Sequence, residues 1–233
     1  MNNLPNIIQY IIDNIDLNID IKSINVDKIY VCDTLHITIS KIIEVDGLDY
    51  KVVDFDFNNW LQVEPYQHST PLNPSATTLK APKITFLHGD PYSTNNEYLQ
   101  LSPETLAKTP FIWLVESYKY DNLPADSSIE AKFKTRLFFL DWADEDKWQS
   151  EQHNEYVIKP MVNLKDKFIQ VIEDDFSFKR LTGINNTVIP RFGVQVSKDD
   201  FKKPKKKVID EDLSGIESNF DLEVYSITNC LCI

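Results

Sequence analysis

The sequence predicts an α+β fold: a mainly antiparallel sheet packed with a long helix and an N-terminal helix, plus a small inserted β module. Three observations predict it. Apolar residues recur with helical spacing in segments 4–15 and 148–172. Elsewhere, apolar and polar residues alternate in short runs that are typical of strands. Because these runs follow one another while the helices lie apart from them, the order indicates α+β rather than alternating βα units.

The first predicted element is an amphipathic helix over residues 4–15. Pro5 falls in its first turn, where the missing N–H costs nothing. The apolar stripe of this helix consists of Ile7, Ile8, Ile11, Ile12 and Ile15. A helix with a single apolar face has to pack against another part of the chain.

A period of two begins at Leu17 and continues through short predicted strands at 17–21, 29–32, 35–39, 41–45, 50–57 and 60–63. Asp46-Gly47 has the signature of a two-residue hairpin turn. Segment 66–82 contains three prolines and is typical of an extended linker. We therefore predict a core formed by residues 1–23 and 81–233, with residues 24–80 as an inserted β module and Pro-rich linker. A module this small should pack against the larger body.

Within the core, the sequence predicts strands at 83–88, 111–115, 128–140, 188–196 and 219–227. The second and third of these form an antiparallel hairpin with an extended polar tip. One side of the long strand 128–140 carries Ala131, Phe133, Thr135, Leu137 and Phe139. Residues 95–106 are predicted to be a loop with a short helical turn that starts at Ser102. We interpret Ser214-Gly215 as turn residues that follow a polar, Lys-rich loop.

The principal helix is predicted over residues 148–172. Its apolar stripe consists of Val157, Met161, Leu164, Phe168 and Ile172. Pro160 lies inside this segment, and we expect it either to kink the helix or to mark its true start.

Composition narrows the class of protein. The chain has 233 residues, 42% of them hydrophobic, and a formal net charge of −12. A surface that coats nucleic acid needs Lys and Arg to neutralise phosphates, so the acidic balance argues against it. The longest apolar runs, such as 111–115, are far shorter than the roughly 20 residues of a membrane-spanning helix, and no membrane partner is expected. The first residues lack the basic region of a secretory signal.

Three cysteines, Cys32, Cys230 and Cys232, give an odd count that fits a reduced compartment. The Cys-x-Cys pair near the end is one residue too short for the usual metal-binding spacing and has no second pair. We interpret it as two small residues on a terminal strand.

Two constellations are candidates for catalysis. His88-Gly89-Asp90 places an imidazole beside a carboxylate, but turn chemistry after a strand explains it without catalysis and is preferred. Asp54 and Asp56 flank Phe55 and point to one face of a strand, where a solvated surface is the preferred interpretation over hydrolysis.

The histidines give no metal-binding pattern, because His36, His68, His88 and His153 lie on different predicted elements. We expect no catalytic residues, no cofactor and no metal, and therefore not an enzyme.

The sharpest charge feature is the segment 198–207, with six lysines and two aspartates. It is a candidate contact with DNA or with a neighbouring subunit, although a solvated loop is an equal alternative. The candidate contact residues are Lys202, Lys203, Lys205, Lys206 and Lys207.

Several segments resemble small structural proteins of tailed bacteriophages. They are 109–116 with its charged hairpin tip, the strand 132–140, the helix opening at 156–164, and 212–216 followed by the strand 220–225. The family that the chain resembles is the tail-completion or tail-terminator type of head–tail connector (neck ring) protein. The Asn- and Ile-rich composition suits phages of AT-rich Bacteroidetes hosts, including the crAss-like group. The resemblance covers residues 4–21 and 83–233, and the β module is an addition to the family's minimal pattern.

The resemblance implies a virion protein, assembled in the host cytoplasm, that forms a six- or twelve-fold homo-oligomeric ring. Its partners would be copies of itself, the portal, and other neck ring or tail proteins. DNA would pass through the channel without sequence-specific binding. The alternative is a monomeric binding or adaptor module that recognises protein or carbohydrate through its aromatic β unit. A hydrolase that uses Asp54, Asp56 or His88 is the least favoured hypothesis.

Overall fold

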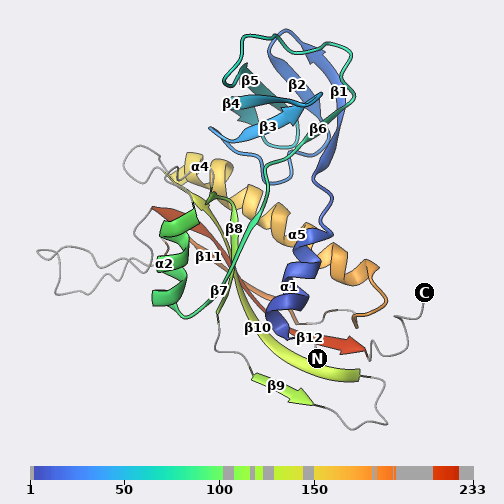
Figure 1. Ribbon diagram of the computed structural model, residues 1–233, viewed down its shortest axis with the longest axis vertical. Coiled ribbons are helices and arrows are strands. Elements are labelled where there is room, and N and C mark those ends of the chain that lie inside the picture. Colours follow the sequence, from blue (N-terminus) through green and yellow to red (C-terminus); the bar gives the residue numbers. More distant parts are fainter. Residues whose placement is uncertain are drawn as a thin grey trace, which may run out of the picture.

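The computed structural model describes residues 3–101, 108–115, 119–122, 129–143, 150–179, 181, 183–190, 192 and 212–225. Within them the chain combines a β-barrel with a larger body of sheet and helices, which confirms the predicted α+β class (Figure 1). The barrel lies beyond one end of the strands of the larger sheet.

Helix α1 (Leu4–Asp13) begins where the sequence predicts it. The side chain of Asn3 caps it by accepting a hydrogen bond from the backbone N–H of Asn6 at 3.1 Å. All five isoleucines of the predicted stripe are buried. The stripe is therefore the face by which α1 packs on the sheet.

Six strands close the barrel in the order β1-β2-β5-β4-β3-β6. Their bounds are β1 Asn18–Asn25, β2 Lys28–Val31, β3 Ile42–Val45, β4 Leu48–Asp56, β5 Trp60–Pro65 and β6 Thr78–Lys80. Alternate side chains fill the interior, and Ile29, Val52 and Leu61 are fully buried. The predicted Asp46-Gly47 turn joins β3 to β4, with Val45 paired to Leu48.

The barrel starts before the predicted inserted segment 24–80 and ends with it. Strand β1 starts at Asn18, before the boundary expected after Ser23, because the chain passes that point as a continuous strand with only a register shift between Ile21 and Ser23. Strand β6 lies in the stretch expected to be linker and pairs with both β1 and β3. It spans only three residues, and pairing on both sides is what makes it a strand.

The predicted strand 35–39 is wrong, because these residues lie in a loop between β2 and β3. Leu35 and Ser40 have positive φ angles of 51° and 69° there. Consecutive side chains from Thr34 to Thr38 are all buried. Their alternation in the sequence does not mark a strand, because the polar members face the larger body instead of solvent.

The larger sheet has the strand order β11-β12-β10-β8-β7, and β9 also pairs with β10. The bounds are β7 Thr85–Gly89, β8 Phe111–Val115, β9 Lys119–Asn122, β10 Ile129–Trp142, β11 Asn185–Ile189 and β12 Leu213–Tyr225. All pairs are antiparallel except β7 with β8. The predicted hairpin of β8 and β10 is confirmed by the pairing of Leu137 with Leu114.

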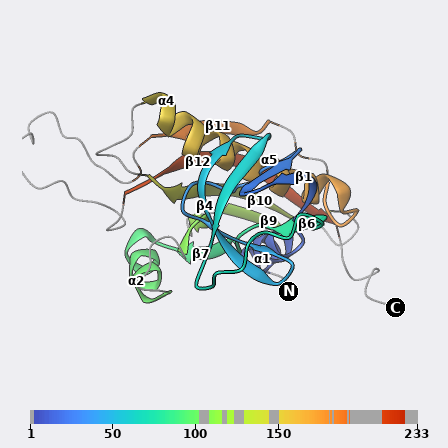
Figure 2. The ribbon, with the colours of Figure 1, turned by 90° about the horizontal axis from the view of Figure 1, so that it is seen from above.

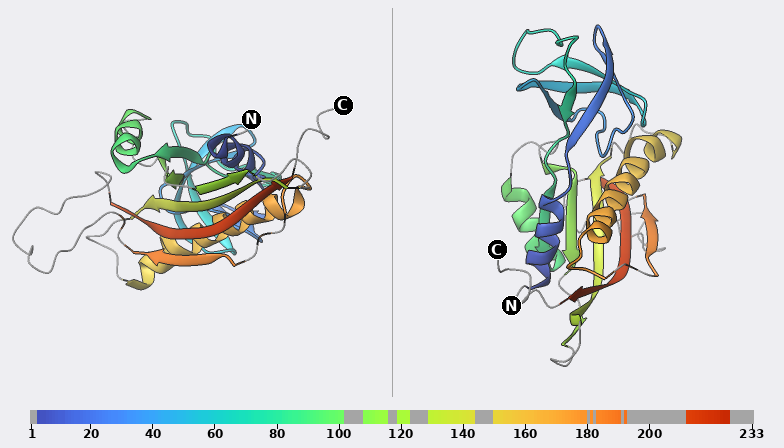
Figure 3. Two further views of the ribbon diagram at one scale, coloured as in Figure 1. Left: turned by 90° about the horizontal axis from the view of Figure 1, so that it is seen from below. Right: turned by 90° about the vertical axis from the view of Figure 1, so that its right-hand side faces the viewer.

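Helices cover both faces of this sheet. The main helix consists of α4 (Ser150–His153), a π-helical turn (Asn154–Ile158) and α5 (Lys159–Asp174), and Pro160 marks the start of α5. Figures 2 and 3 show α1 and α5 together over one face, where they share a core with the predicted apolar side of β10. Helix α2 (Pro91–Leu101) packs by Tyr98 on the opposite face.

Two expectations in this body are wrong. Residues 95–101 belong to α2 instead of a loop, because Asp90 caps that helix: its carboxylate accepts bonds from the backbone N–H and the hydroxyl of Ser93 at 3.2 and 2.7 Å. The helical turn expected at Ser102 falls on residues 102–107, outside the described part of the chain. Ser214-Gly215 is not a turn but part of β12, where Gly215 faces the backbone of β10.

Gly215 is required by this close approach. A Cβ atom at this position would lie 1.9 Å from the carbonyl oxygen of Phe139. We expect Gly215→Ala to lower the free energy of unfolding by about 3 kcal/mol, because β10 and β12 would have to separate locally. Urea denaturation of the variant and the wild type measures the difference in the free energy of unfolding. The matched control is Gly47→Ala, where φ is +76° but nothing lies within 4 Å, and about 1 kcal/mol is expected. Equal losses for the two variants would contradict the argument.

Candidate functional site

The two aspartates considered for hydrolysis lie on the outer surface of the barrel. Asp54 and Asp56 are exposed on β4, while Phe55 between them is buried. The Asp54 carboxylate accepts a hydrogen bond from the backbone N–H of Phe55, and that of Asp56 accepts one from the Asn59 amide at 2.7 Å. This is the solvated strand face that the sequence favours.

The structure also separates the other polar candidates. His88 is exposed, and its ring lies 5.9 Å from that of Phe86, while Asp90 serves as the cap of α2. Cys32 is an exposed free thiol. Across the described residues, no group of three or more His, Cys, Asp or Glu side chains is placed to hold a metal ion. Outside those residues lie Lys202, Lys203, Lys205, Lys206, Lys207, Cys230 and Cys232.

The most strongly organised polar site is the junction between barrel and sheet. Lys41, at the end of the β2–β3 loop, and Asp141, near the end of β10, are each 1% exposed and form an ion pair at 2.6 Å. The Lys41 ammonium also donates to the carbonyl and the hydroxyl of Thr109, at 2.7 and 2.5 Å. It therefore has three oxygen acceptors, one for each of its protons.

Both oxygens of the Asp141 carboxylate also accept hydrogen bonds. It accepts bonds from the Thr38 hydroxyl at 3.2 Å and from the backbone N–H of Trp142 at 2.7 Å. Burial lowers the pKa of Lys41, and the adjacent Asp141 carboxylate acts in the opposite direction. A buried pair with this many hydrogen bonds fixes the orientation of the two parts that it joins.

His36 lies beside this pair and is completely buried. Its Nε2 atom is 2.8 Å from the carbonyl oxygen of Pro82, so Nε2 carries the proton and donates it. Nδ1 has no hydrogen-bond partner among the described residues. Burial lowers the pKa of His36 to about 4, and the Lys41 charge adds to this, while Asp141 and Asp33 oppose it. The imidazole is therefore neutral at pH 7.

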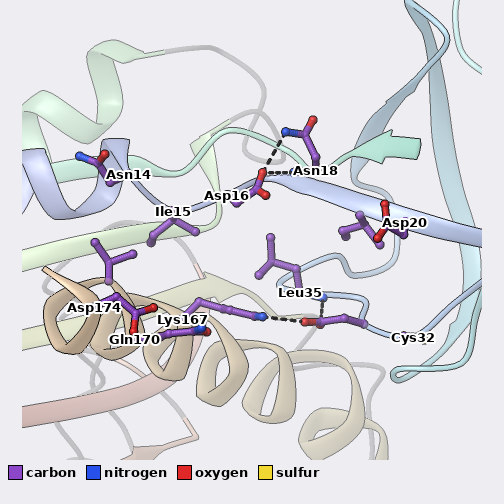
Figure 4. A pocket seen from close by; sticks show the side chains of 13 residues that line it. Asn14, Ile15, Asp16, Asn18, Asp20, Cys32, Leu35, Lys167, Gln170 and Asp174 are labelled. Carbon is purple, nitrogen blue, oxygen red and sulfur yellow. Dashed lines mark hydrogen bonds and ion pairs between the residues drawn. The ribbon is translucent and has the colours of Figure 1, made fainter. Parts of the chain in front are cut away.

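A pocket of about 460 Å³ opens at the same junction, between α1, β1, the β2–β3 loop and α5 (Figure 4). Asp33 bridges its walls: its carboxylate accepts a bond from the Asn163 amide at 2.8 Å and pairs with Lys167 at 3.1 Å. Burial alone would raise the pKa of Asp33, but hydrogen bonds from Leu35 and Asn163 and the charge of Lys167 keep it below its usual value.

The charged side chains that line the pocket are mainly acidic. Figure 4 shows Asp20 and Asp174 at opposite ends, with Asp16 between them. Lys167 is the single basic residue among the residues that line it. The electrostatics therefore disfavour an anionic ligand such as a phosphate. The bonds of Asp33 to α5 make this region a second attachment of the barrel to the body.

The residues of this junction are absent from the candidates that the sequence suggested. Lys41 stands in the apolar-rich segment Ile37–Ile43, and Asp141 directly follows the apolar run Leu137–Leu140, which is the one signal that the sequence offers. A single charge beside apolar residues has many explanations. The pairing of two residues 100 positions apart comes only from the fold.

Comparison with protein-family models, with curated proteins and with solved structures gave no match. In the described part of the chain, no helix has the length and apolar character needed to cross a membrane.

We expect Lys41→Met to lower the free energy of unfolding by about 3–5 kcal/mol, because it leaves the Asp141 carboxylate buried without its counter-charge. Lys41→Met combined with Asp141→Asn should recover part of this loss, since no buried charge remains and the amide still accepts from Trp142. Urea denaturation of the singles and the double gives the coupling energy. The control Arg136→Met breaks an exposed pair with Glu217 and should cost less than about 1 kcal/mol. A double variant that loses the sum of the two single effects would contradict this account.

His36 makes a separate, pH-dependent contribution to the free energy of unfolding. The pKa of His36 is lower in the folded state than the usual 6.5. The stability that the neutral imidazole contributes is therefore fully present above pH 6.5 and is lost as the pH falls toward 4. Between pH 7 and pH 5 it should account for about 2 kcal/mol of lost stability. His36→Gln retains a donor for Pro82 and should flatten the profile over this range. His88→Gln, at an exposed histidine, is the matched control; an unchanged slope in His36→Gln would refute the assignment.

Proposed function

We propose that this chain is a virion structural protein that forms a homo-oligomeric ring in the neck of a tailed bacteriophage. It would occupy the head–tail connector or tail-terminator region and join portal and tail around the DNA channel. The observation that carries the proposal is the attachment of the barrel to the α+β body through buried polar contacts. A subunit that connects two neighbouring assemblies has to hold its two parts in one orientation.

Three contacts make this attachment. Lys41 is bound to Asp141 and Thr109 at one end of the sheet. The β2–β3 loop is bound to α5 through Asp33 and Asn163. The ring of Phe55 packs on that of Tyr156 in the π-helical turn, with centroids 5.5 Å apart. Two of these contacts are made to the main helix and the third to the end of β10, so the barrel is attached at two separate elements of the body.

The charge distribution supports the same proposal. With a net charge of −12, the chain as a whole repels the phosphates of a duplex, so DNA in a channel would slide rather than bind. The exposed, separate positions of Asp54, Asp56 and His88 favour a structural role over hydrolysis. The binding partners would then be proteins: further copies of the chain, the portal and other neck or tail proteins.

One observation favours the second candidate, an adaptor that binds through the barrel. Tyr30 and Trp60 are cross-strand neighbours on the outer wall of the barrel, and the Lys28 ammonium lies 4.0 Å from the centre of the Trp60 ring. Half-buried aromatic side chains with a nearby charge are typical of recognition surfaces for protein or carbohydrate. A ring subunit that binds a neighbouring ring through this surface would combine the role in the ring with recognition through the barrel.

The proposal is tested on virions of the phage that encodes the chain. We expect mass spectrometry of purified particles to detect it in a fixed number of copies. Antibodies raised against the purified protein should label the neck between head and tail in negatively stained particles. Major capsid antibodies serve as the control and should label the head. Absence of the chain from purified particles would refute the proposal and favour the adaptor.

A further inference from the structure

Strand β11 forms an edge of the larger sheet that nothing blocks among the described residues. It pairs on one side only, with β12. Its residues are Asn-Asn-Thr-Val-Ile, and four of the five are exposed. Natural edge strands are usually protected from pairing by charged residues or proline within the strand. In a chain with 26% charged residues, β11 contains neither.

Two exposed apolar side chains lie along the same edge. Val188, within β11, is 55% exposed. Phe176 is 97% exposed and precedes residues 177–179, which bond to the outer side of β12 through Lys179 N–H to the carbonyl of Glu223 at 3.0 Å. Exposed apolar residues beside an open edge are typical of a protein interface, and aromatic side chains dominate the energy of such interfaces.

The charges beside this edge differ in sign from the rest of the chain. On the sheet face opposite α1 and α5, four cations (Lys132, Lys134, Arg136 and Lys179) meet three anions (Glu217, Asp221 and Glu223). Arg136 and Lys179 are about half exposed while Glu217 and Glu223 are mostly covered, whereas Asp221 is more exposed than Lys132. These seven side chains sum to +1, so all the other residues of a chain of −12 sum to −13. Another copy of the chain is therefore a complementary partner.

The opposite edge of the same sheet has matching properties. Strand β7 (Thr85–Gly89) pairs among the described residues with β8 only, and it contains no Asp, Glu, Lys or Arg. The helices that contact it, α1 and α2, carry one acid each, Asp13 and Glu97, and no basic residue.

Strand direction relates these two edges. From the pairing of the sheet, β7 and β12 run together, and β11 runs against both. Copies related by rotation about an axis along the strands would therefore place β11 of one antiparallel to β7 of the next. Antiparallel pairing is the more stable kind, and a head-to-tail contact of this type generates a ring when the rotation between copies closes.

We propose that β11 of one copy adds to the β7 edge of a second copy, so that the sheet continues from subunit to subunit. This inference rests on the proposed function, which makes a second copy the expected occupant. The barrels would then all lie at one end of the ring, because each lies beyond one end of its strands (Figure 1).

Sedimentation equilibrium of the purified full chain over a wide concentration range tests the contact. We expect the wild type to self-associate and Val188→Lys to weaken that association by about tenfold or more, because a charge on β11 opposes edge pairing. Val26→Lys makes the same substitution at an 85% exposed site on the barrel and should associate as the wild type does. A wild type that stays monomeric, or equal association of the two variants, would overturn the inference.

A mixing experiment tests the head-to-tail geometry. His88→Lys blocks the β7 edge, and Val188→Lys blocks the β11 edge, so neither variant should assemble alone. An equimolar mixture should form heterodimers through the two intact edges and stop there. Mixtures that remain monomeric, or that grow beyond dimers, would refute pairing of β11 with β7. Association through β11 in a chain that is absent from virions would refute the proposed function alone.

Discussion

The ion pair of Lys41 and Asp141 is the constraint on which the arrangement of the molecule depends. Removing two charges from water is unfavourable unless every proton and lone pair finds a partner. Here Thr109, Thr38 and the Trp142 backbone supply those partners from both sides of the junction. The hydrogen bonds are complete in one relative orientation of barrel and sheet. The pair therefore specifies how the two parts meet, which apolar contacts alone would leave less defined.

The barrel is inserted without disturbing the body that carries it. Its first and last strands are paired neighbours, with Asn18 opposite Lys80, and the backbone N–H of Ala81 donates to the carbonyl of Leu17 at 2.8 Å. The chain thus leaves α1 and returns to β7 at nearly the same place. An insertion with adjacent ends lets α1 and β7 pack as if they were continuous. It also explains why the barrel has a core of its own, separate from the two cores on the faces of the larger sheet.

The elements that the sequence predicts correctly are those in which one face is buried over several turns or residues. The stripes of α1 and α5 and the apolar side of β10 repeat often enough to outweigh single exceptions. The errors have a different origin. Strand β6 is too short to show a period. Residues 35–39 alternate because their polar members contact the larger body, and not because they pair as a strand. The start of β12 contains the turn-like Ser214-Gly215. At Gly215 a glycine is present because another backbone lies close, a cause that local sequence does not reveal.

The sequence by itself determined the α+β class, the two amphipathic helices, the hairpin turn at Asp46-Gly47 and the acidic balance. These follow from periodicity, turn chemistry and charge, which are local or additive properties. Only the tertiary structure decided that six strands close into a barrel, that Lys41 meets Asp141, and that β11 remains an open edge among the described residues. Each of these depends on which segments distant in the chain become neighbours. That choice is made by the packing of the whole molecule, because the same apolar residues are compatible with many pairings until the cores form.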